Sequence, residues 1–251
     1  MPPPHYYSRL APFQALFLTG DPILTYHHVG PRGRGARIKG LYVSPRLFER
    51  QMAELAQAGF SAAPLRDMNT GAAASERRVF LTFDDGFRDV FEHALPLLRR
   101  HGFRATQFLV AGLLGGANDW QQRAGDLAEP LMDVAQVRDW LASGQEIGSH
   151  TVTHPWLTQL SPAAAREEIV ASKKLLEDRF DVPVEHFCYP YGDWNESVLD
   201  LVKNAGYKTA CTTITGINTP GGSPFKLKRF TARYPSRSFK AFWSRLTHRG
   251  S

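Results

Sequence analysis

The sequence predicts an α/β fold with a mostly parallel sheet, and a barrel is favoured over an open sheet. Three observations indicate this class. Short apolar runs alternate with amphipathic segments, several amphipathic segments end at glycine, and 251 residues fit one large α/β domain. Such strand–helix alternation is typical of parallel sheets. In a barrel the functional residues gather at the C-terminal ends of the strands, so candidate residues are expected there.

Six short runs are predicted to be strands, because they are rich in β-branched or aromatic residues and are bounded by Gly, Pro or Asp. They cover residues 23–27, 79–83, 106–110, 146–149, 186–189 and 208–212. Five helices are predicted between them, over residues 45–58, 91–101, 134–143, 162–180 and 195–204. Ser44 is expected to cap the first of these helices, with Pro45 in its first turn, and Ser161-Pro162 is expected to start the fourth.

The composition excludes several classes of protein. With 43% hydrophobic and 22% charged residues the chain is not disordered throughout, and two cysteines cannot form a disulfide framework. Cys188 and Cys211 are expected to be buried thiols, with a single bridge as the alternative. There is no run of ~18 apolar residues that would predict a transmembrane helix, and residues 1–5 lack a signal-peptide pattern. The chain as written is expected to be cytoplasmic, with cell-envelope association as the alternative.

Basic residues are concentrated at the C-terminal end. The net charge is +6, and residues 226–251 contain eight Lys and Arg and no acidic residue. In this stretch Phe239, Phe242, Trp243 and Leu246 share one face of a predicted helix, which we expect to dock on the barrel. A surface for anionic polymer or membrane is the alternative, and no nucleic-acid partner is predicted. The predicted organisation is an N-terminal extension over residues 1–20 and a single domain over residues 21–251.

The first candidate for chemistry is Thr82-Phe83-Asp84-Asp85-Gly86, at the end of an apolar strand. Gly86 permits a sharp turn, so both carboxylates can reach one site. Two close carboxylates differ in proton affinity, which suits one as a ligand and the other as a base. The structural alternative is a helix N-cap followed by an acid in the first turn.

His150 and His154 follow another predicted strand and lie four residues apart. Imidazoles at this spacing can bind one metal on a helix or in a tight turn, and Pro155 favours the turn. Two imidazoles and one carboxylate make a three-ligand catalytic site with open positions for water and substrate. The second aspartate then remains as a general base. Together the two motifs predict a metal-dependent hydrolase.

The third candidate is the turn Cys188-Tyr189-Pro190-Tyr191-Gly192, again at a strand end. Pro190 restricts one backbone dihedral and Gly192 permits an unusual one. The turn can therefore direct a backbone N–H toward a substrate oxyanion and place Tyr191 in the wall of a cleft. The alternative is an ordinary turn with a packing tyrosine.

In this order, the three motifs resemble those of the polysaccharide deacetylases, which form carbohydrate esterase family four, the NodB-homology group. The flanks match too, with Leu24-Thr25-Tyr26-His27-His28-Val29 upstream and Pro155-Trp156-Leu157-Thr158 after the histidines. The resemblance implies a distorted, incomplete (β/α)7-type barrel that removes N-acetyl groups from amino-sugar polymers. It also implies a divalent metal, usually zinc, with cobalt, nickel or manganese as alternatives.

The resemblance further implies a role for each matching residue. Asp85, His150 and His154 would bind the metal, and Asp84 would be the general base. The backbone N–H of Tyr191 would join the metal in stabilising the tetrahedral oxyanion.

Two departures from the family pattern concern the base and the acid. Many members have an arginine that orients the catalytic aspartate two residues before the motif proline, where this chain has Cys188. The late Leu-x-His that supplies the general acid is matched only by Leu246-Thr247-His248. Tyr26-His27 instead resembles a permuted version of that motif in the poly-N-acetylglucosamine subgroup. We therefore choose His27 as the general acid, ahead of its neighbour His28 and of His248.

The leading hypothesis is thus a metal-dependent hydrolase that releases acetate from an N-acetylated amino-sugar polysaccharide or oligosaccharide. A C–N hydrolase acting on a small non-sugar amide is one alternative. An inactive glycan-binding module is another, motivated by Cys188 and the basic tail, although an intact Asp84 argues against it. Three tryptophans are expected to pack internally, with sugar platforms as the alternative: Trp120, Trp156 and Trp194.

Overall fold

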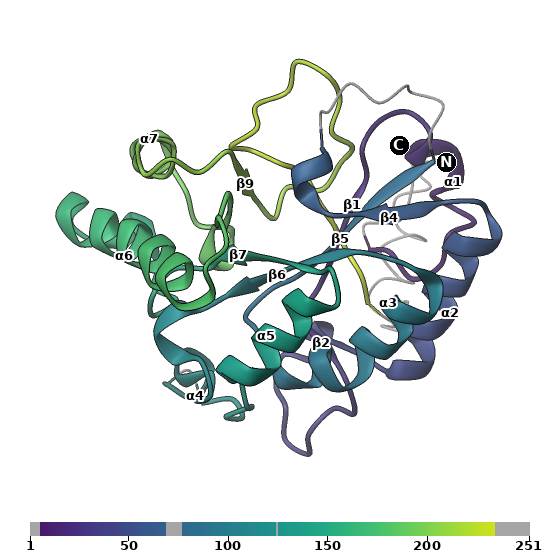
Figure 1. Cartoon of the computed structure of the whole chain (residues 1–251), viewed down its shortest axis with the longest axis horizontal. Coiled ribbons are helices and arrows are strands. Elements are labelled where there is room, and N and C mark those ends of the chain that lie inside the picture. The colour runs from purple at the N-terminus through teal and green to yellow at the C-terminus, as the bar shows by residue number, and fades with distance from the viewer. Residues whose placement is uncertain (1–5, 69–76, 124, 234–251) are drawn as a thin grey trace, which may run out of the picture.

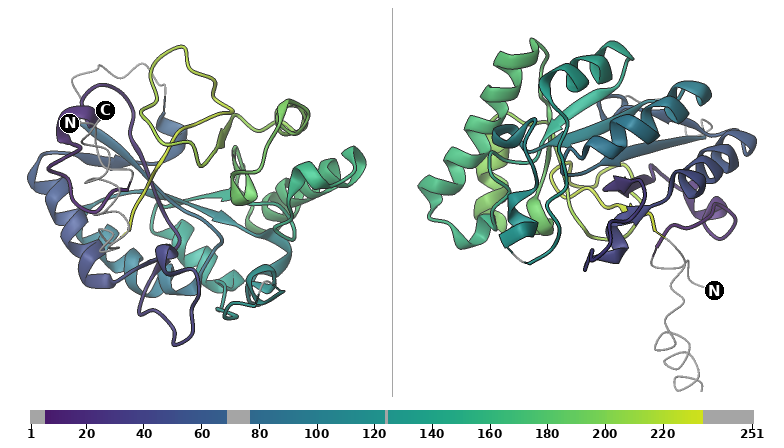
Figure 2. Two further views of the ribbon diagram at one scale, coloured as in Figure 1. Left: turned by 180° about the vertical axis from the view of Figure 1, so that it is seen from behind. Right: turned by 90° about the horizontal axis from the view of Figure 1, so that it is seen from below.

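A computed structural model describes residues 6–68, 77–123 and 125–233. Their centre is a curled parallel sheet in the order β10-β1-β5-β6-β7-β8-β9, with helices following one another around its outside (Figures 1 and 2). The strands on this path are β1 (Ile23–Tyr26), β5 (Arg78–Phe83), β6 (Ala105–Leu109), β7 (Glu146–Ser149), β8 (His186–Cys188), β9 (Thr209–Cys211) and β10 (Phe230–Thr231). The predicted α/β class with an incomplete parallel barrel is confirmed.

The sheet also has one branch. Strand β4 (Ser61–Ala63) pairs with the first half of β5, and β6 pairs with the second half. Two further strands, β2 (His28–Val29) and β3 (Tyr42–Val43), form a separate parallel pair. None of these three strands, nor β10, was predicted, because none of them forms a longer run of β-branched or aromatic residues bounded by Gly, Pro or Asp.

All five predicted helices are present with slightly different bounds. They are α2 (Pro45–Gln57), α3 (Leu95–His101), α5 (Val134–Ala142), α6 (Pro162–Phe180) and α7 (Glu196–Asn204), beside the shorter α1 (Gln14–Phe17) and α4 (Asp119–Arg123). The side chains of Ser44 and Ser161 each accept a backbone N–H of the first turn, so the predicted cap at Ser44 is confirmed and Ser161 caps α6 in the same way. The segment predicted as one helix over 91–101 begins instead with a π-helical turn, Val90–Ala94. Pro96 lacks the N–H that a regular α-helix would need there.

The C-terminal ends of the strands leave the three motifs in loops at one end of the barrel. Several strands end one residue earlier than predicted, so residues 27, 110, 189 and 212 lie in these loops. Single 3-10 turns occur at Lys39–Leu41, Leu65–Asp67, Ala111–Leu113, Leu157–Gln159 and Pro190–Gly192. The turn Pro190–Gly192 lies within the third motif and Leu157–Gln159 begins three residues after His154, and residues of both turns line the cleft described below.

The gap between β9 and β1 is bridged by the segment that leads into β10. Leu227 donates its N–H to Ala210 and accepts the N–H of Thr212, so it pairs with β9. Only a few residues later, Phe230 and Thr231 pair with β1. The residue between these two pairings, Arg229, is 3% exposed and thus lies inside the fold.

The N-terminal segment packs against the barrel through aromatic rings. Tyr7, Phe13 and Phe17 are buried and contact one another, and Phe13 and Phe17 both contact Phe230 of β10. The backbone of Tyr7 also bonds to residues on either side of Ala232. The described part of the predicted extension, residues 6–20, is therefore packed on the domain.

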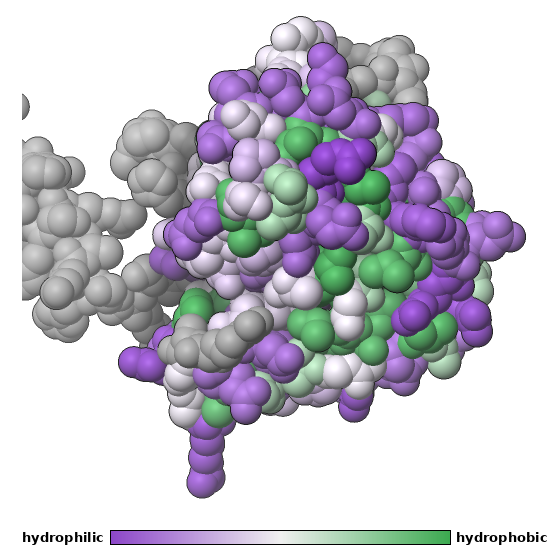
Figure 3. Space-filling model, turned by 90° about the vertical axis from the view of Figure 1, so that its left-hand side faces the viewer, coloured by the Kyte–Doolittle hydropathy of each residue, from purple (hydrophilic) through white to green (hydrophobic). Residues whose placement is uncertain are grey.

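Several features outside the cleft complete the description. Cys188 and Cys211 are buried free thiols, as predicted. Among the described residues, no helix is both long and apolar enough to span a membrane. The face of the molecule shown in Figure 3 has hydrophobic side chains in patches separated by hydrophilic ones. The predicted C-terminal helix, with Phe239, Phe242, Trp243 and Leu246, lies outside the described residues.

Candidate active site

The residues of all three motifs line one cleft of about 880 Å³ at the C-terminal ends of the strands. Asp84 and Asp85 follow β5, His150 and His154 follow β7, and Tyr191 follows β8. Since all these strands are parallel, their C-terminal ends open at the same end of the barrel. Residues separated by more than a hundred positions are thereby brought into one site.

Asp85 lies between the two motif histidines. Its Oδ1 is 3.3 Å from Nε2 of His150 and 3.3 Å from Nε2 of His154, and all three side chains are buried. Burial alone would raise the pKa of Asp85, but its hydrogen bonds with the two histidines hold that pKa well below its usual value. An ionised carboxylate and two imidazole nitrogens pointing at one spot are a donor set that fits a divalent metal.

Contacts outside the ligand set orient both histidine rings. Nδ1 of His150 donates to the carbonyl oxygen of Cys188 at 2.7 Å, which orients the ring with Nε2 directed toward Asp85. The ring of His154 stacks on Trp120 with a centroid distance of 4.3 Å. Its backbone N–H also donates to the side chain of Thr151 at 3.0 Å. Both imidazoles are therefore oriented before any ion binds.

Backbone strain is concentrated at these turns. Among the described non-glycine residues, five have positive φ, and four of them belong to the three motifs: Asp85 (72°), Thr151 (69°), His154 (63°) and Tyr191 (59°). Such conformations cost of order 1–3 kcal/mol each and persist where surrounding structure enforces them. Their clustering in one cleft marks it as the candidate functional site.

Asp84 is bound by an arginine that the motifs do not reveal. Arg229 donates from Nη1 to Oδ1 and from Nη2 to Oδ2, both at 2.8 Å, and its Nε donates to the carbonyl oxygen of Thr212. Burial would raise the pKa of Asp84, but the adjacent guanidinium outweighs it and lowers the pKa. The two residues are 145 positions apart, and no spacing signal singles out Arg229 within the basic C-terminal stretch.

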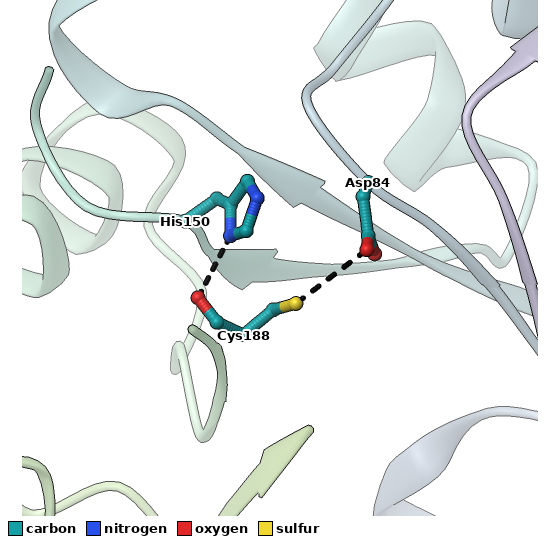
Figure 4. Close-up of side chains that lie close together, drawn as sticks. All are labelled: Asp84, His150 and Cys188. Carbon is teal, nitrogen blue, oxygen red and sulfur yellow. Dashed lines mark hydrogen bonds between the residues drawn. The ribbon is translucent and has the colours of Figure 1, made fainter. Parts of the chain in front are cut away.

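Although Cys188 stands where many family members have an arginine, Asp84 still has a guanidinium partner in Arg229. The thiol lies beside Asp84, with Sγ 3.6 Å from Oδ2 (Figure 4). Nη2 of Arg229 is 3.2 Å from the same sulfur. Burial raises the pKa of Cys188 to about 11, so the thiol is neutral near pH 7. Asp84, His150 and Cys188 also lie close enough to share an ion. The positively charged Arg229 is bound to Asp84 and would repel a metal ion at these three residues, so this second set is unfavourable for a metal.

The two adjacent histidines after β1 face different surroundings. His27 lines the cleft, with Nε2 3.9 Å from Oδ2 of Asp84. His28 points elsewhere, with Nδ1 2.9 Å from Oδ2 of Asp89 and its ring stacked on Tyr42. The third candidate acid, His248, lies outside the described residues.

Tyr191 forms part of the cleft wall. Its ring contacts the metal-ligand candidate His154 edge to face, with a centroid distance of 4.5 Å. The turn begun by Pro190 is tight, because Gly192 donates to Tyr189 at 2.9 Å. Gly192 has φ of 71°, and a Cβ there would lie 2.2 Å from Oγ1 of Thr213. Only glycine fits this position without movement of its neighbour.

Comparison with known proteins agrees with this geometry. A family model described as polysaccharide deacetylase matches residues 71–210. YxkH of Bacillus subtilis (strain 168) is 28% identical over 225 residues, which cover 88% of this chain and 74% of YxkH. A chitooligosaccharide deacetylase of Bradyrhizobium sp. (strain ANU 289) is 28% identical over 140 residues, covering 55% of this chain and 57% of that protein. The chain thus matches little more than half the length of the latter.

A solved structure has the same fold over almost its whole length. It is the Streptococcus pyogenes deacetylase PplD in complex with acetate, which is 26% identical in sequence. The superposition has a TM-score of 0.74 and covers 90% of this chain and 97% of that one. The described barrel is therefore the fold of a deacetylase.

Proposed function

Since the chain belongs to the polysaccharide deacetylase family, we propose that it is a metal-dependent hydrolase that removes N-acetyl groups from an amino-sugar polymer or oligomer and releases acetate. One observation carries this proposal. A three-residue metal-ligand set and a buried carboxylate, Asp84, meet in a single open cleft. Chitooligosaccharides, the substrate named for one relative, belong to this substrate class.

The metal ligands in this proposal are Asp85, His150 and His154. A divalent ion bound there would act as a Lewis acid, activating a water molecule and polarising the amide carbonyl. Two imidazoles and one carboxylate form a ligand set typical of catalytic zinc, so zinc is our first choice of ion. Cobalt, nickel and manganese are the alternatives.

The remaining residues would move and hold protons. Asp84 accepts a proton from the attacking water, and Arg229 holds both carboxylate oxygens in place for this step. His27 donates a proton to the leaving amine. The backbone N–H of Tyr191 donates to the carbonyl oxygen as negative charge develops on it.

The inactive-module alternative rested on the missing arginine at Cys188 and on the basic tail. Because Arg229 supplies a guanidinium to Asp84 from the segment just before β10, the first of these grounds for expecting inactivity is gone. The range of substrates that the enzyme hydrolyses distinguishes the small-amide alternative from the proposal. Acetate release from N-acetylglucosamine oligomers but not from simple N-alkyl acetamides supports the sugar assignment, and the reverse result overturns it.

Metal removal is the first test. The purified protein is expected to hold about one divalent ion per chain, because three converging ligands bind it far better than two. Chelation is expected to abolish acetate release, and added zinc to restore it. The double variant His150→Ala/His154→Ala is expected to contain no ion by elemental analysis. Full occupancy in that variant contradicts the ligand assignment.

The second test concerns the general acid. Burial lowers the pKa of His27 below 6.5, although the neighbouring Asp85 and Asp84 offset part of this effect. Because only a small fraction of His27 is protonated at neutral pH, we expect His27→Ala to lower turnover by about 10²-fold. This is the lower end of the range for general acids. The alkaline limb of kcat/KM is expected below about pH 6.5 and should vanish in the variant. Normal turnover in His27→Ala beside an inactive His248→Ala would overturn this choice.

A further inference from the structure

Four aromatic rings form a continuous series from the metal-ligand set to the rim of the cleft. Trp120 stacks on His154, and His154 meets Tyr191 edge to face. Tyr191 in turn stacks on Trp156, with a centroid distance of 4.1 Å and an interplanar angle of 6°. Trp156 and Tyr191, named here the rim pair, both line the same cleft as Asp84.

The rim pair is more exposed to solvent than Trp120 and Trp194, the other two tryptophans considered as sugar platforms. Trp120 is 7% exposed and covered by His154, and Trp194 is partly buried beneath the ammonium group of Lys226. Trp156 is 45% exposed and Tyr191 is 40% exposed, although large aromatic rings are usually covered. Tyr191 covers one face of the Trp156 ring, so the exposed area lies on the remaining face and edges. The flat apolar surface of the rim pair is therefore continuous with the catalytic cleft.

Hydrogen bonds hold the two loops of the rim pair together. The carboxylate of Asp193 accepts the backbone N–H of Thr158 at 2.8 Å and its hydroxyl at 2.7 Å. Thr158 follows Trp156 by two residues, and Asp193 follows Tyr191 by two. Both rings are thus fixed in position before a ligand arrives, which lowers the entropy lost on binding.

We propose that the outer face of Trp156 is a sugar-binding subsite, which stacks on a pyranose ring of the chain whose neighbouring unit lies at Asp84. This inference rests on the proposed function and extends it to a preference for oligomers over the monosaccharide. The C–H face of a pyranose is apolar and flat, so it packs on an aromatic ring while its hydroxyls stay in water. The Trp156 ring is only two ring contacts from His154, so a unit close to the reacting one reaches it.

The test compares Trp156→Ala with wild type on N-acetylglucosamine and its β-1,4- and β-1,6-linked oligomers up to the pentamer. Loss of one stacking contact is expected to lower kcat/KM for the longer oligomers about tenfold. Turnover of the monosaccharide is expected to be unchanged, and Trp156→Phe, which keeps a ring, is expected to retain most activity on oligomers. Leu175→Ala is the matched control, because Leu175 is 40% exposed on α6 and does not line the cleft.

Equal rates for Trp156→Ala and wild type at every length overturn the subsite. The same loss on monosaccharide and pentamer also overturns it, because the ring then acts only by supporting Tyr191. Failure of wild type to release acetate from any oligomer counts against the proposed function instead. In that event calorimetric binding of the two pentamers decides. If Trp156→Ala weakens the affinity for a pentamer and Leu175→Ala does not, the subsite is supported. If Trp156→Ala leaves the affinity unchanged, or wild type binds neither pentamer, the subsite is overturned.

Discussion

Asp84→Asn is expected to lower the rate of acetate release about 10⁴-fold while the protein keeps its metal. General bases contribute up to about this factor, and an amide cannot accept the proton of the attacking water. The variant also leaves the buried Arg229 without a charged partner, which places the loss at the upper end of the range. Turnover and elemental analysis on the same preparation measure both quantities.

Asp85→Asn is the matched comparison, because the two aspartates are adjacent and equally buried. Asp85 faces both histidines at 3.3 Å, so its substitution is expected to lower metal affinity together with activity. If Asp84→Asn loses the metal and Asp85→Asn keeps it, the two roles are exchanged. If both variants remain active, the deacetylase mechanism proposed here is wrong.

Arg229→Met is expected to destabilise the fold by about 3–5 kcal/mol and to abolish most activity. Removing one partner of a buried ion pair leaves the other charge uncompensated, and Asp84 and Arg229 are 4% and 3% exposed. Arg229→Lys keeps a charge but loses the paired hydrogen bonds, so an intermediate effect is expected. Lys228→Met, at the exposed neighbouring position, is the control and should change stability little. Chemical denaturation gives the free energies of unfolding.

The pH dependence distinguishes a lost ion pair from lost packing. In wild type the lowered pKa of Asp84 means that its ionised form stabilises the fold above about pH 4, and this contribution disappears as the pH falls through the folded pKa. Arg229→Met removes the guanidinium that does most to lower the pKa of Asp84. Burial then raises that pKa. The destabilisation should therefore shrink as the pH falls from neutral toward about 4. A constant difference across this range would indicate packing alone.

Much of the fold and part of the site could be read from local sequence. Alternating apolar runs, serine caps and terminal glycines located six strands and five helices to within a few residues. The aspartate pair and the histidine pair were candidates because each follows an apolar strand. Strand direction then places both at one end of a parallel barrel. Strands β4 and β10 were missed, since their sequences carry no strand signal and they form only by pairing with β5 and β1.

The sequence by itself determined the class of fold, the metal-ligand candidates and the carboxylate beside them, because these depend on residues close together in the chain. Tertiary structure alone decided what surrounds that carboxylate. The chain crosses from β9 to β1 at residues 227–231, and this crossing brings Arg229 to Asp84 across 145 positions. It also turns His27 toward the cleft and His28 toward Asp89, and leaves Trp156 as the exposed tryptophan at the rim. Contacts of this kind arise from how the barrel closes and from how its loops pack, which local periodicity and propensity do not encode.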